Sequence, residues 1–321
     1  MTTTTTTPVC VSFTQPPPHS ICKNPKWSQN GIRVAGNVIA GSTSSQLNHP
    51  RGIFIDRHDD LYIADSWNSR VQRFVQNSLL GATVAGGNGE GNGVTQLSSP
   101  QDVFVDSVGN LFIADYGSYR IQKWTMNSGQ GTTVAGNGTD QSCRPRGVFV
   151  DKKDIYVSDH TTGYLMKYSS LDSNFGTVIA KDISSSAGMF VDQCDTVYVA
   201  DSGRHSIEKF MKNSSRGITV AGIKYVRGSA SNQLSGPNDV TSDQYGNLYI
   251  ADTGNHRIQR VSAKDGRMKT IVGITGEKGT DAKHLDEPVS VALDSEWNLY
   301  VSDYVNSRIQ KFSFESGDLY C

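Results

Sequence analysis

One motif, LYIADTGNHRIQRV at residues 248–261, decides the fold, because it recurs in six related copies along the chain. Each copy joins an apolar segment ending in Asp to a short polar turn and a second segment that resembles RIQRV. The copies occupy residues 61–74, 111–124, 155–168, 197–210, 248–261 and 299–312. Their aspartates lie 42 to 51 residues apart. Short strands that repeat about every 40 to 50 residues indicate a β-propeller or a solenoid.

Each repeat predicts four strands. A short apolar segment that usually follows Pro, such as PRGIFID at residues 50–56, precedes the motif, and a TVAG-like segment, such as residues 83–86, follows it. The LYIA segment is apolar at successive positions, which predicts a strand buried on both faces. Blades packed face to face around an axis provide such burial.

The ends of the repeat array predict how the ring closes. No TVAG-like segment follows the last repeat, whereas IRVAG at residues 32–36 precedes the first one. We expect this N-terminal strand to pair beside Ile309 in the last blade, because closure removes the exposed edges of an open array. The chain is therefore predicted to be an all-β, six-bladed β-propeller of four-stranded antiparallel blades. Truncation before Gly31 is expected to be tolerated, and truncation through Gly36 is expected to open the ring.

Composition suggests two regions, a Thr/Pro-rich disordered tail or stalk at residues 1–29 and the propeller at residues 30–321. A stalk would make the chain an extracellular or cell-surface head of a longer protein; without one, a cytoplasmic location is expected. The formal net charge of -1 provides no overall field for nucleic acid. No apolar run approaches the roughly 20 residues that span a bilayer. We expect a monomer.

The cysteines and glycosylation sequons bear on the compartment. Five cysteines, at positions 10, 22, 143, 194 and 321, show no metal-binding spacing. Cys22 and Cys321 flank the repeat array, so a disulfide between them is plausible in an oxidising compartment. Asn137 and Asn213 begin N-glycosylation sequons in expected loops.

The motif resembles the NHL-repeat family of six-bladed propellers. Repeat five carries the clearest match, with Asn255, His256, Arg257, Ile258 and Gln259, and the resemblance covers roughly residues 30–315. Repeats three and four depart from it, with Tyr164 and Ser206 where the other repeats have Arg. The family includes protein-interaction domains, RNA-binding domains and a zinc-dependent lyase that matures amidated peptides, so the resemblance implies a fold and leaves the function open.

The repeated aspartate is interpreted as structural. Repetition in every blade is not expected of a catalytic residue, and Asp commonly accepts hydrogen bonds from backbone amides of its own turn. The Arg five residues later is expected to brace the same turn or a neighbouring blade. These turn aspartates are Asp65, Asp115, Asp159, Asp201, Asp252 and Asp303.

The sequence contains no convincing catalytic set. In the amidating lyase, histidine ligands lie at the approach to the first strand of a blade, and here only His49 lies near such a position. His256 belongs to the repeat pattern and is interpreted as structural. The Gly-rich segment at residues 86–93 lacks the Gly-Lys-Ser/Thr ending of a phosphate loop. We therefore assign no catalytic residue and no cofactor, and leave open an axial calcium or zinc ion.

The loops that differ between repeats are the expected binding surface. The turn inside each motif and the entry to each first strand should lie at the same end of the ring, and exposed aromatics beside Arg are suited to partner recognition. The expected binding residues are Arg51, Trp67, Gln101, Tyr116, Tyr119, Arg146, His160, Tyr164, Arg204, His205, Asn238 and Tyr304. The leading hypothesis is a noncatalytic binding module for a protein or glycan. A metal-dependent lyase or hydrolase and a single-stranded RNA-binding domain are the alternatives.

Overall fold

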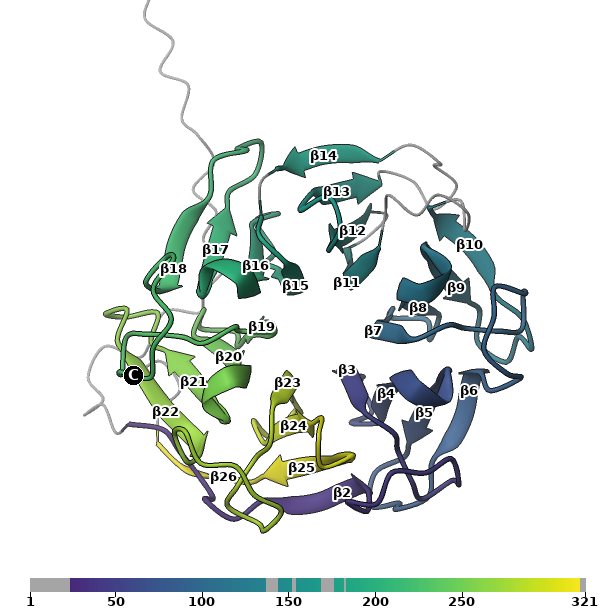
Figure 1. The fold of residues 1–321 in the computed structure, drawn as a ribbon, viewed down its shortest axis with the longest axis horizontal. Helices are drawn as coiled ribbons and strands as arrows, with labels where there is room; N and C mark the ends of the chain where they lie inside the picture. The colour runs from purple at the N-terminus through teal and green to yellow at the C-terminus, as the bar shows by residue number, and fades with distance from the viewer. Residues whose placement is uncertain (1–23, 137–143, 152–153, 169–175, 182, 318–321) are drawn as a thin grey trace, which may run out of the picture.

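The computed structural model describes residues 24–136, 144–151, 154–168, 176–181 and 183–317. Six four-stranded antiparallel sheets surround a central axis (Figure 1). We number the blades from the one that contains β3. These six sheets are the blades that the sequence predicted, so the six-bladed propeller is confirmed.

The first three blades follow one another along the chain. Blade 1 contains β3 (Pro50–Ile55), β4 (Leu61–Asp65), β5 (Arg70–Phe74) and β6 (Ala82–Gly86). Blade 2 contains β7 (Pro100–Val105), β8 (Leu111–Asp115), β9 (Arg120–Trp124) and β10 (Thr132–Ala135). Blade 3 contains β11 (Pro145–Asp151), β12 (Asp154–Asp159), β13 (Leu165–Tyr168) and β14 (Thr177–Ala180).

The remaining blades keep the same order, except at the closure. Blade 4 contains β15 (Ser186–Val191), β16 (Val197–Asp201), β17 (Ser206–Phe210) and β18 (Ile218–Gly222). Blade 5 contains β19 (Asp239–Ser242), β20 (Leu248–Asp252), β21 (Arg257–Val261) and β22 (Met268–Gly273). Blade 6 contains β23 (Pro288–Leu293), β24 (Leu299–Asp303), β25 (Arg308–Phe312) and β2 (Ile32–Gly36).

Short 3-10 helices follow the second strand in four blades. They are η1 (Ser66–Asn68), η2 (Tyr116–Ser118), η3 (Ser202–Arg204) and η4 (Thr253–Asn255). The helices of the described residues are therefore too short to cross a membrane.

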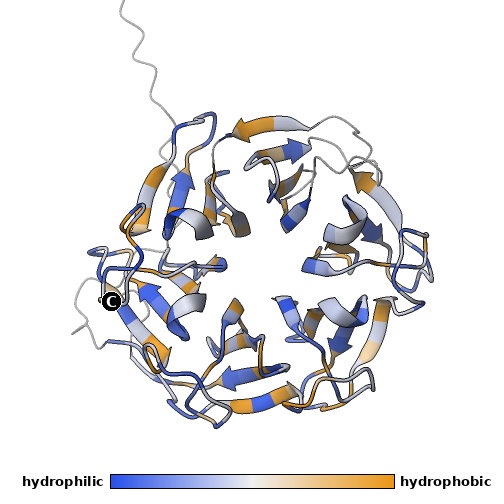
Figure 2. Cartoon of the chain, viewed as in Figure 1, coloured by the Kyte–Doolittle hydropathy of each residue, from blue (hydrophilic) through white to orange (hydrophobic). Residues whose placement is uncertain are grey.

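Strand β2 closes the ring as expected. It pairs antiparallel with β25, with Ala35 opposite Ile309 and Ile32 opposite Lys311. Both faces of the second strands are buried, as the apolar LYIA segments predicted. Each interface between blades has its own apolar core, for example the cluster that includes Tyr62 of blade 1 and Val103 of blade 2. Figure 2 shows polar and apolar residues interspersed in every blade.

A short strand precedes residue 30, within the segment that was expected to be a tail or stalk. Strand β1 (Lys26–Trp27) pairs with β26 (Phe314–Ser316) outside blade 6. The Trp27 side chain is only 2% exposed, packs edge-on against Tyr249 and donates from Nε1 to the carbonyl of Trp297 at 2.8 Å. Trp27 therefore joins blades 5 and 6, and removal of residues up to Gly31 discards part of the core.

The cysteine and sequon expectations are only partly within the described chain. Cys194 is disulfide-bonded. Cys10, Cys22, Cys143 and Cys321 lie outside the described residues, and so does Asn137. Asn213 is exposed in the loop between β17 and β18.

We predict that three N-terminal truncations will differ sharply. A chain that begins at Asn24 should unfold like the full chain in thermal circular dichroism. A chain that begins at Gly31 should lose about 3–5 kcal/mol, the usual cost of removing a buried Trp. A chain that begins at Asn37 should lose cooperative unfolding, because β25 becomes an unpaired edge. Equal melting temperatures for the first two chains would contradict the role given to Trp27.

Candidate functional site

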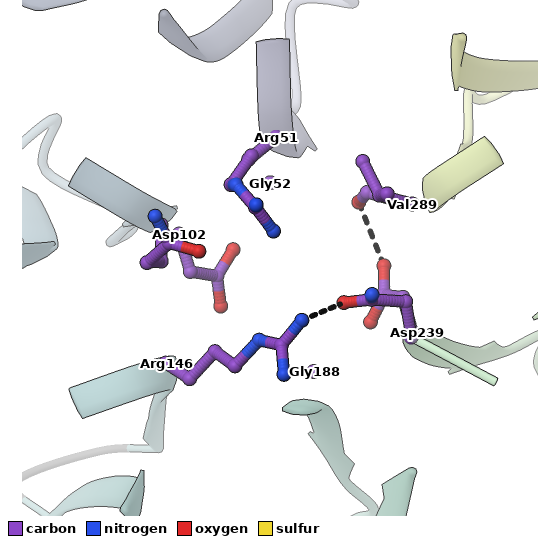
Figure 3. Close-up of a pocket in the computed structure, with 10 residues that line it drawn as sticks. Arg51, Gly52, Asp102, Arg146, Gly188, Asp239 and Val289 are labelled. Atoms are coloured by element: carbon purple, nitrogen blue, oxygen red, sulfur yellow. Dashed lines mark hydrogen bonds between the residues drawn. The ribbon is translucent and has the colours of Figure 1, made fainter. Parts of the chain in front are cut away.

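The first strands of the blades bring polar side chains together at one mouth of the central channel. Four of these side chains line a cavity of about 20 Å³ on the axis: Arg51, Gln101, Arg146 and Asn238. They lie at the starts of β3, β7, β11 and β19, respectively. Figure 3 shows Arg51 and Arg146 pointing towards each other across this mouth. Arg146 Nη2 donates to Asn238 Oδ1 at 3.2 Å. Four of the expected binding residues are thus neighbours in space. We call this cavity the axial mouth.

Two carboxylates that sequence reasoning missed also line the axial mouth. Asp102 of blade 2 accepts from the Val148 amide at 2.9 Å, and Asp239 of blade 5 accepts from the Ser290 hydroxyl at 2.7 Å. Each carboxylate thereby ties its strand to the next blade. Repeats one, three and four have glycine at the matching position, and a Cβ at Gly52 would collide with the Asp102 carboxylate. The contrast of Asp with Gly at one repeat position was the available sequence signal.

Burial and like charges shift the pKa values of these groups. Burial, and then the charge of Arg51, lower the pKa of Arg146 to about 10. Burial raises the pKa of Asp239 to about 6. Burial, and then the charge of Asp239, raise the pKa of Asp102 well above its usual range. In the described chain neither guanidinium has a carboxylate within ion-pair distance. The mouth therefore holds two guanidiniums close together beside carboxylates that resist ionisation.

An aromatic cluster extends from the axial mouth across blades 6 and 1. The guanidinium of Arg51 lies 4.7 Å above the ring of Tyr304, and the His49 ring meets Tyr304 edge-on at 4.8 Å. On its other side His49 stacks on Trp67, with ring centroids 3.8 Å apart. Trp67 is 61% exposed. From the sequence, His49 was considered only as a metal ligand. In the structure it contacts two of the expected binding residues, Trp67 and Tyr304.

A second, looser cluster lies on blades 2 and 3. Arg144 lies 5.3 Å above the rings of both Tyr116 and Tyr119, and Tyr116 lies 6.1 Å from His160. Burial and the charge of Arg146 lower the pKa of His160, so its ring is neutral near pH 7. Arg144 was not among the expected residues, because it precedes the Pro that marked each strand entry.

The other expected residues face away from the axial mouth. Tyr164 packs under Lys181 at 5.4 Å, and Arg204 is buried beside Asp201 and Tyr225. His205 Nδ1 accepts from the Gly236 amide at 3.0 Å, and His256 Nδ1 accepts from the Glu287 amide at 3.1 Å. Both histidines thus hold the loop that enters the next blade.

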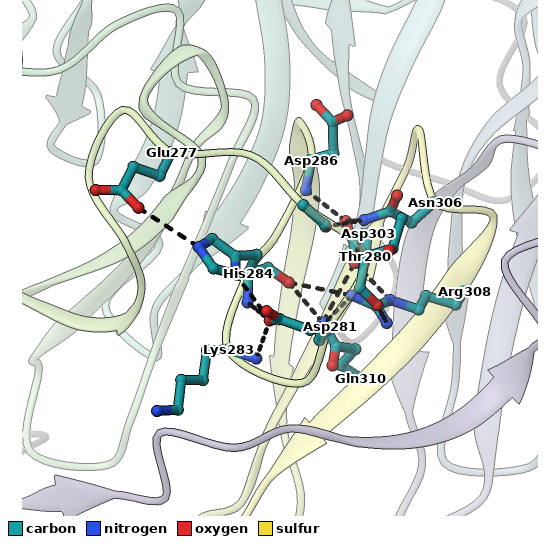
Figure 4. A network of polar contacts seen from close by, with 11 residues as sticks. Glu277, Thr280, Asp281, Lys283, His284, Asp286, Asp303, Asn306, Arg308 and Gln310 are labelled. Atoms are coloured by element: carbon teal, nitrogen blue, oxygen red, sulfur yellow. Dashed lines mark hydrogen bonds and ion pairs between the residues drawn. The ribbon is translucent and has the colours of Figure 1, made fainter.

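The loops around the mouth are held by a repeated Asp–Arg pair. Figure 4 shows it in blade 6, where Arg308 Nε donates to Asp303 Oδ2 at 2.7 Å and its terminal nitrogens donate to the carbonyls of Thr280, Asp281 and His284. Asp303 Oδ1 also accepts from the Asp286 amide at 2.7 Å. The pair therefore fixes the whole connection between blades 5 and 6. We call this arrangement the loop clamp.

The loop clamp recurs in three other blades. Its Arg–Asp distances are 2.7 Å for Arg70–Asp65, 2.9 Å for Arg120–Asp115 and 2.8 Å for Arg257–Asp252. Each of these aspartates accepts an amide 17 residues earlier, in the entry loop of its own blade. This partner differs from the amides of the Asp's own turn that were expected. Blades 3 and 4 lack the Arg, and there Asp159 and Asp201 do bond within their own turns, to the amides of Thr162 and Arg204.

The described residues do not offer an evident metal centre. No three His, Cys, Asp or Glu side chains gather there closely enough to hold an ion. His49 has its Nδ1 2.9 Å from Asn48 Oδ1 and its ring against Trp67, so it is not turned to the axis as a ligand. The polar groups at the axis are instead suited to hydrogen bonding and charge recognition.

Comparison with known proteins identifies the repeats. The family model described as NHL repeat matches residues 47–74 and 234–261. The chain is an NHL-repeat six-bladed propeller. The matched segments are the entry loops and motifs of blades 1 and 5, both of which carry the loop clamp.

Curated relatives and solved structures extend the similarity without fixing the function. The NHL propeller is 27% identical to peptidyl-glycine alpha-amidating monooxygenase B of Xenopus laevis over 52% of this chain and 16% of that protein. It is 30% identical to human NHL repeat-containing protein 3 over 38% of this chain and 37% of that protein. The chain thus spans well under two thirds of these relatives. An auxiliary nutrient binding protein from Bacteroides ovatus shares the fold, with a TM-score of 0.68, 16% identity and coverage of 91% of this chain and 78% of that one.

We predict that the loop clamp of the NHL propeller is essential for stability. Arg308→Ala leaves the Asp303 carboxylate buried without its cation, which should cost about 3–5 kcal/mol in urea unfolding. The matched control is Arg267→Ala, which removes an 87% exposed Arg paired with Asp265 and should change stability by less than about 1 kcal/mol. Equal effects of the two replacements would show that the clamp contributes no more than a surface pair.

Proposed function

We propose that this propeller is a noncatalytic binding module that captures a protein or glycan through an anionic group of the partner at the axial mouth. The observation that carries the proposal is the convergence of Arg51 and Arg146 without a carboxylate partner in the described chain. The pKa of Arg146 is lowered by burial and then by the charge of Arg51, so the two guanidiniums repel one another. An anion between them would relieve that repulsion and form charge-assisted hydrogen bonds.

The geometry also leaves donor capacity for such a group. The Nε of Arg51 is buried and has no hydrogen-bond partner among the described residues. Arg146 donates one bond, to Asn238. The anion would rest on the guanidiniums at the axial mouth.

Amidating enzymes are among the curated relatives, and a streptogramin B lyase is among the structures that share the fold. A catalytic zinc requires three converging protein ligands and an open position, and the residues around this axial mouth do not fit that set. The two aspartates are bonded to neighbouring strands and His49 is packed against Trp67. We therefore favour binding over catalysis.

We further propose an oxidising, extracellular or secretory location for this module. Cys194 is disulfide-bonded, and disulfides persist mainly in such compartments. The exposed Asn213 sequon supports the same proposal.

We predict that sulfate, used as a simple anionic probe in isothermal titration calorimetry, will bind through the guanidiniums. Arg146→Gln keeps a donor for Asn238 but removes the charge, and should weaken binding about ten- to hundredfold. Arg51→Gln should act similarly, whereas Arg267→Ala should bind like the unaltered protein. Sulfate binding that survives both Gln replacements, with unchanged melting temperatures, would overturn the proposal.

We also predict that anion binding strengthens as the pH falls. Above pH 6 the Asp239 carboxylate is ionised and its charge opposes an anion at the mouth; below about pH 6 it is protonated and neutral. Burial lowers the pKa values of His49 and His160, and the positive charge that these rings gain as the pH falls acts in the same direction. Sulfate affinity measured from pH 8 to pH 5 should rise, and Asp239→Asn should flatten this rise around pH 6. Affinity that falls with decreasing pH would contradict the assignment.

A further inference from the structure

The rings beside the axial mouth form a continuous path. Trp67, His49 and Tyr304 contact one another in that order, and Arg51 covers the inner end at Tyr304. Arg51 Nη2 also lies 3.4 Å from the Tyr304 hydroxyl. The path therefore leads from an exposed indole on blade 1 to the guanidinium pair on the axis. We call it the aromatic track.

The aromatic track is held in place before any ligand arrives. The Trp67 amide donates to the Asn48 carbonyl at 3.2 Å, and the same Asn48 holds His49 Nδ1 through its side chain at 2.9 Å. Burial, and then the Arg51 charge, lower the pKa of His49, so its ring is neutral near pH 7. A neutral imidazole stacks on an indole without the cost of desolvating a charge. The rings are thus held in position before a ligand binds, with the exposed Trp67 at the outer end of the track.

Amide side chains stand at the inner end of the track. Gln101 donates from Nε2 to the Ser99 carbonyl, and no residue of the described chain bonds to its Oε1. Asn238 accepts from Arg146 through Oδ1, and its Nδ2 has no protein partner among the same residues. A donor and an acceptor therefore accompany the guanidiniums. This combination of flat apolar faces, amides and paired cations matches a sugar ring that carries hydroxyls and a carboxylate.

We propose that the aromatic track and the axial mouth together bind an acidic, uronate-containing oligosaccharide. One sugar carboxylate sits on Arg51 and Arg146, the hydroxyls of that sugar reach Gln101 and Asn238, and the next sugars lie on the track towards Trp67. This inference rests on the proposed anion capture and specifies its ligand. Binding is noncovalent, so no bond of the glycan is broken.

A peptide fits the same surface less well. Peptide recognition generally uses an open strand edge or pockets for side chains. Strand β3, which bears Arg51, is the innermost strand of blade 1 and pairs with β4 on one edge. Its other edge faces the channel, where the Ile53 amide already bonds to Ser290 of blade 6.

The test compares four probes by calorimetry on the full chain: tetragalacturonate, a neutral galactose tetramer, an acidic tetrapeptide with a free carboxyl terminus, and sulfate. We expect tetragalacturonate to bind at least about tenfold more tightly than the neutral tetramer or the peptide. Trp67→Ala should weaken tetragalacturonate binding about five- to tenfold and leave sulfate affinity within about twofold, because the lost contact is stacking alone. Arg146→Gln should weaken both.

The control is Tyr225→Ala, which removes a 69% exposed ring beside Arg204 in the connection between β18 and β19 and should leave tetragalacturonate affinity unchanged. Because Trp67 is largely exposed, Trp67→Ala should melt at the same temperature as the unaltered protein. Two results would overturn the glycan assignment and leave the anion capture intact. One is sulfate binding through Arg146 without a preference of the protein for tetragalacturonate. The other is a tetragalacturonate affinity that Trp67→Ala does not change. Tighter binding of the peptide would do the same. Absence of both sulfate and tetragalacturonate binding would overturn the underlying anion capture as well.

Discussion

The loop clamp is the interaction on which the functional face depends. In four blades a buried Asp–Arg pair spans the turn after the second strand and the entry loop that leads into the same blade. Buried ion pairs stabilise little in comparison with apolar packing, because both charges lose their water. Their geometry is demanding, however, since each guanidinium must satisfy several carbonyls at once. We infer that the clamp serves mainly to fix loop conformation, so that residues just beyond it, such as Trp67 and His49, occupy one position.

The axis imposes a second constraint, because six strands approach one another there. At one repeat position blades 1, 3 and 4 have glycine, blades 2 and 5 have aspartate, and blade 6 has serine. Gly52 and Gly188 make room for the carboxylates of the following blades, because a Cβ at either position would collide with Asp102 or Asp239. The carboxylates then bond to the next strand. Ring packing and the electrostatics of the mouth are therefore consequences of the same substitutions, and a change at Asp102 or Asp239 alters both.

The sequence predicted the ring well and the site only partly. Strand periodicity and the displaced IRVAG segment are local patterns, so they were sufficient for six blades and for the pairing of β2 with β25. The position after the strand-entry Pro correctly gathered Arg51, Gln101 and Arg146, because the repeat aligns equivalent residues around one axis. The repeat does not determine the direction of each side chain. Arg204 and His205 were therefore grouped with the mouth residues, although in the structure they contact the connection between blades 4 and 5. Trp27 lies outside any repeat, and its burial depends on contacts with Tyr249 and Trp297 that are distant in sequence.

The turns on blades 4 and 5 differ from those on the other four blades, so the loop face of the ring is asymmetric. The guanidiniums come from blades 1 and 3, and the rings that adjoin them come from blades 6, 1, 2 and 3. On blades 4 and 5 the turns carry His205 and His256, which accept amides of the next entry loop and therefore hold the scaffold. A ligand that bridges Arg51 and Arg146 would therefore extend over the side of the ring where blades 6 and 1 meet. The turns of blades 4 and 5 thus support the scaffold, whereas those of blades 6, 1, 2 and 3 place aromatic rings beside the axial mouth.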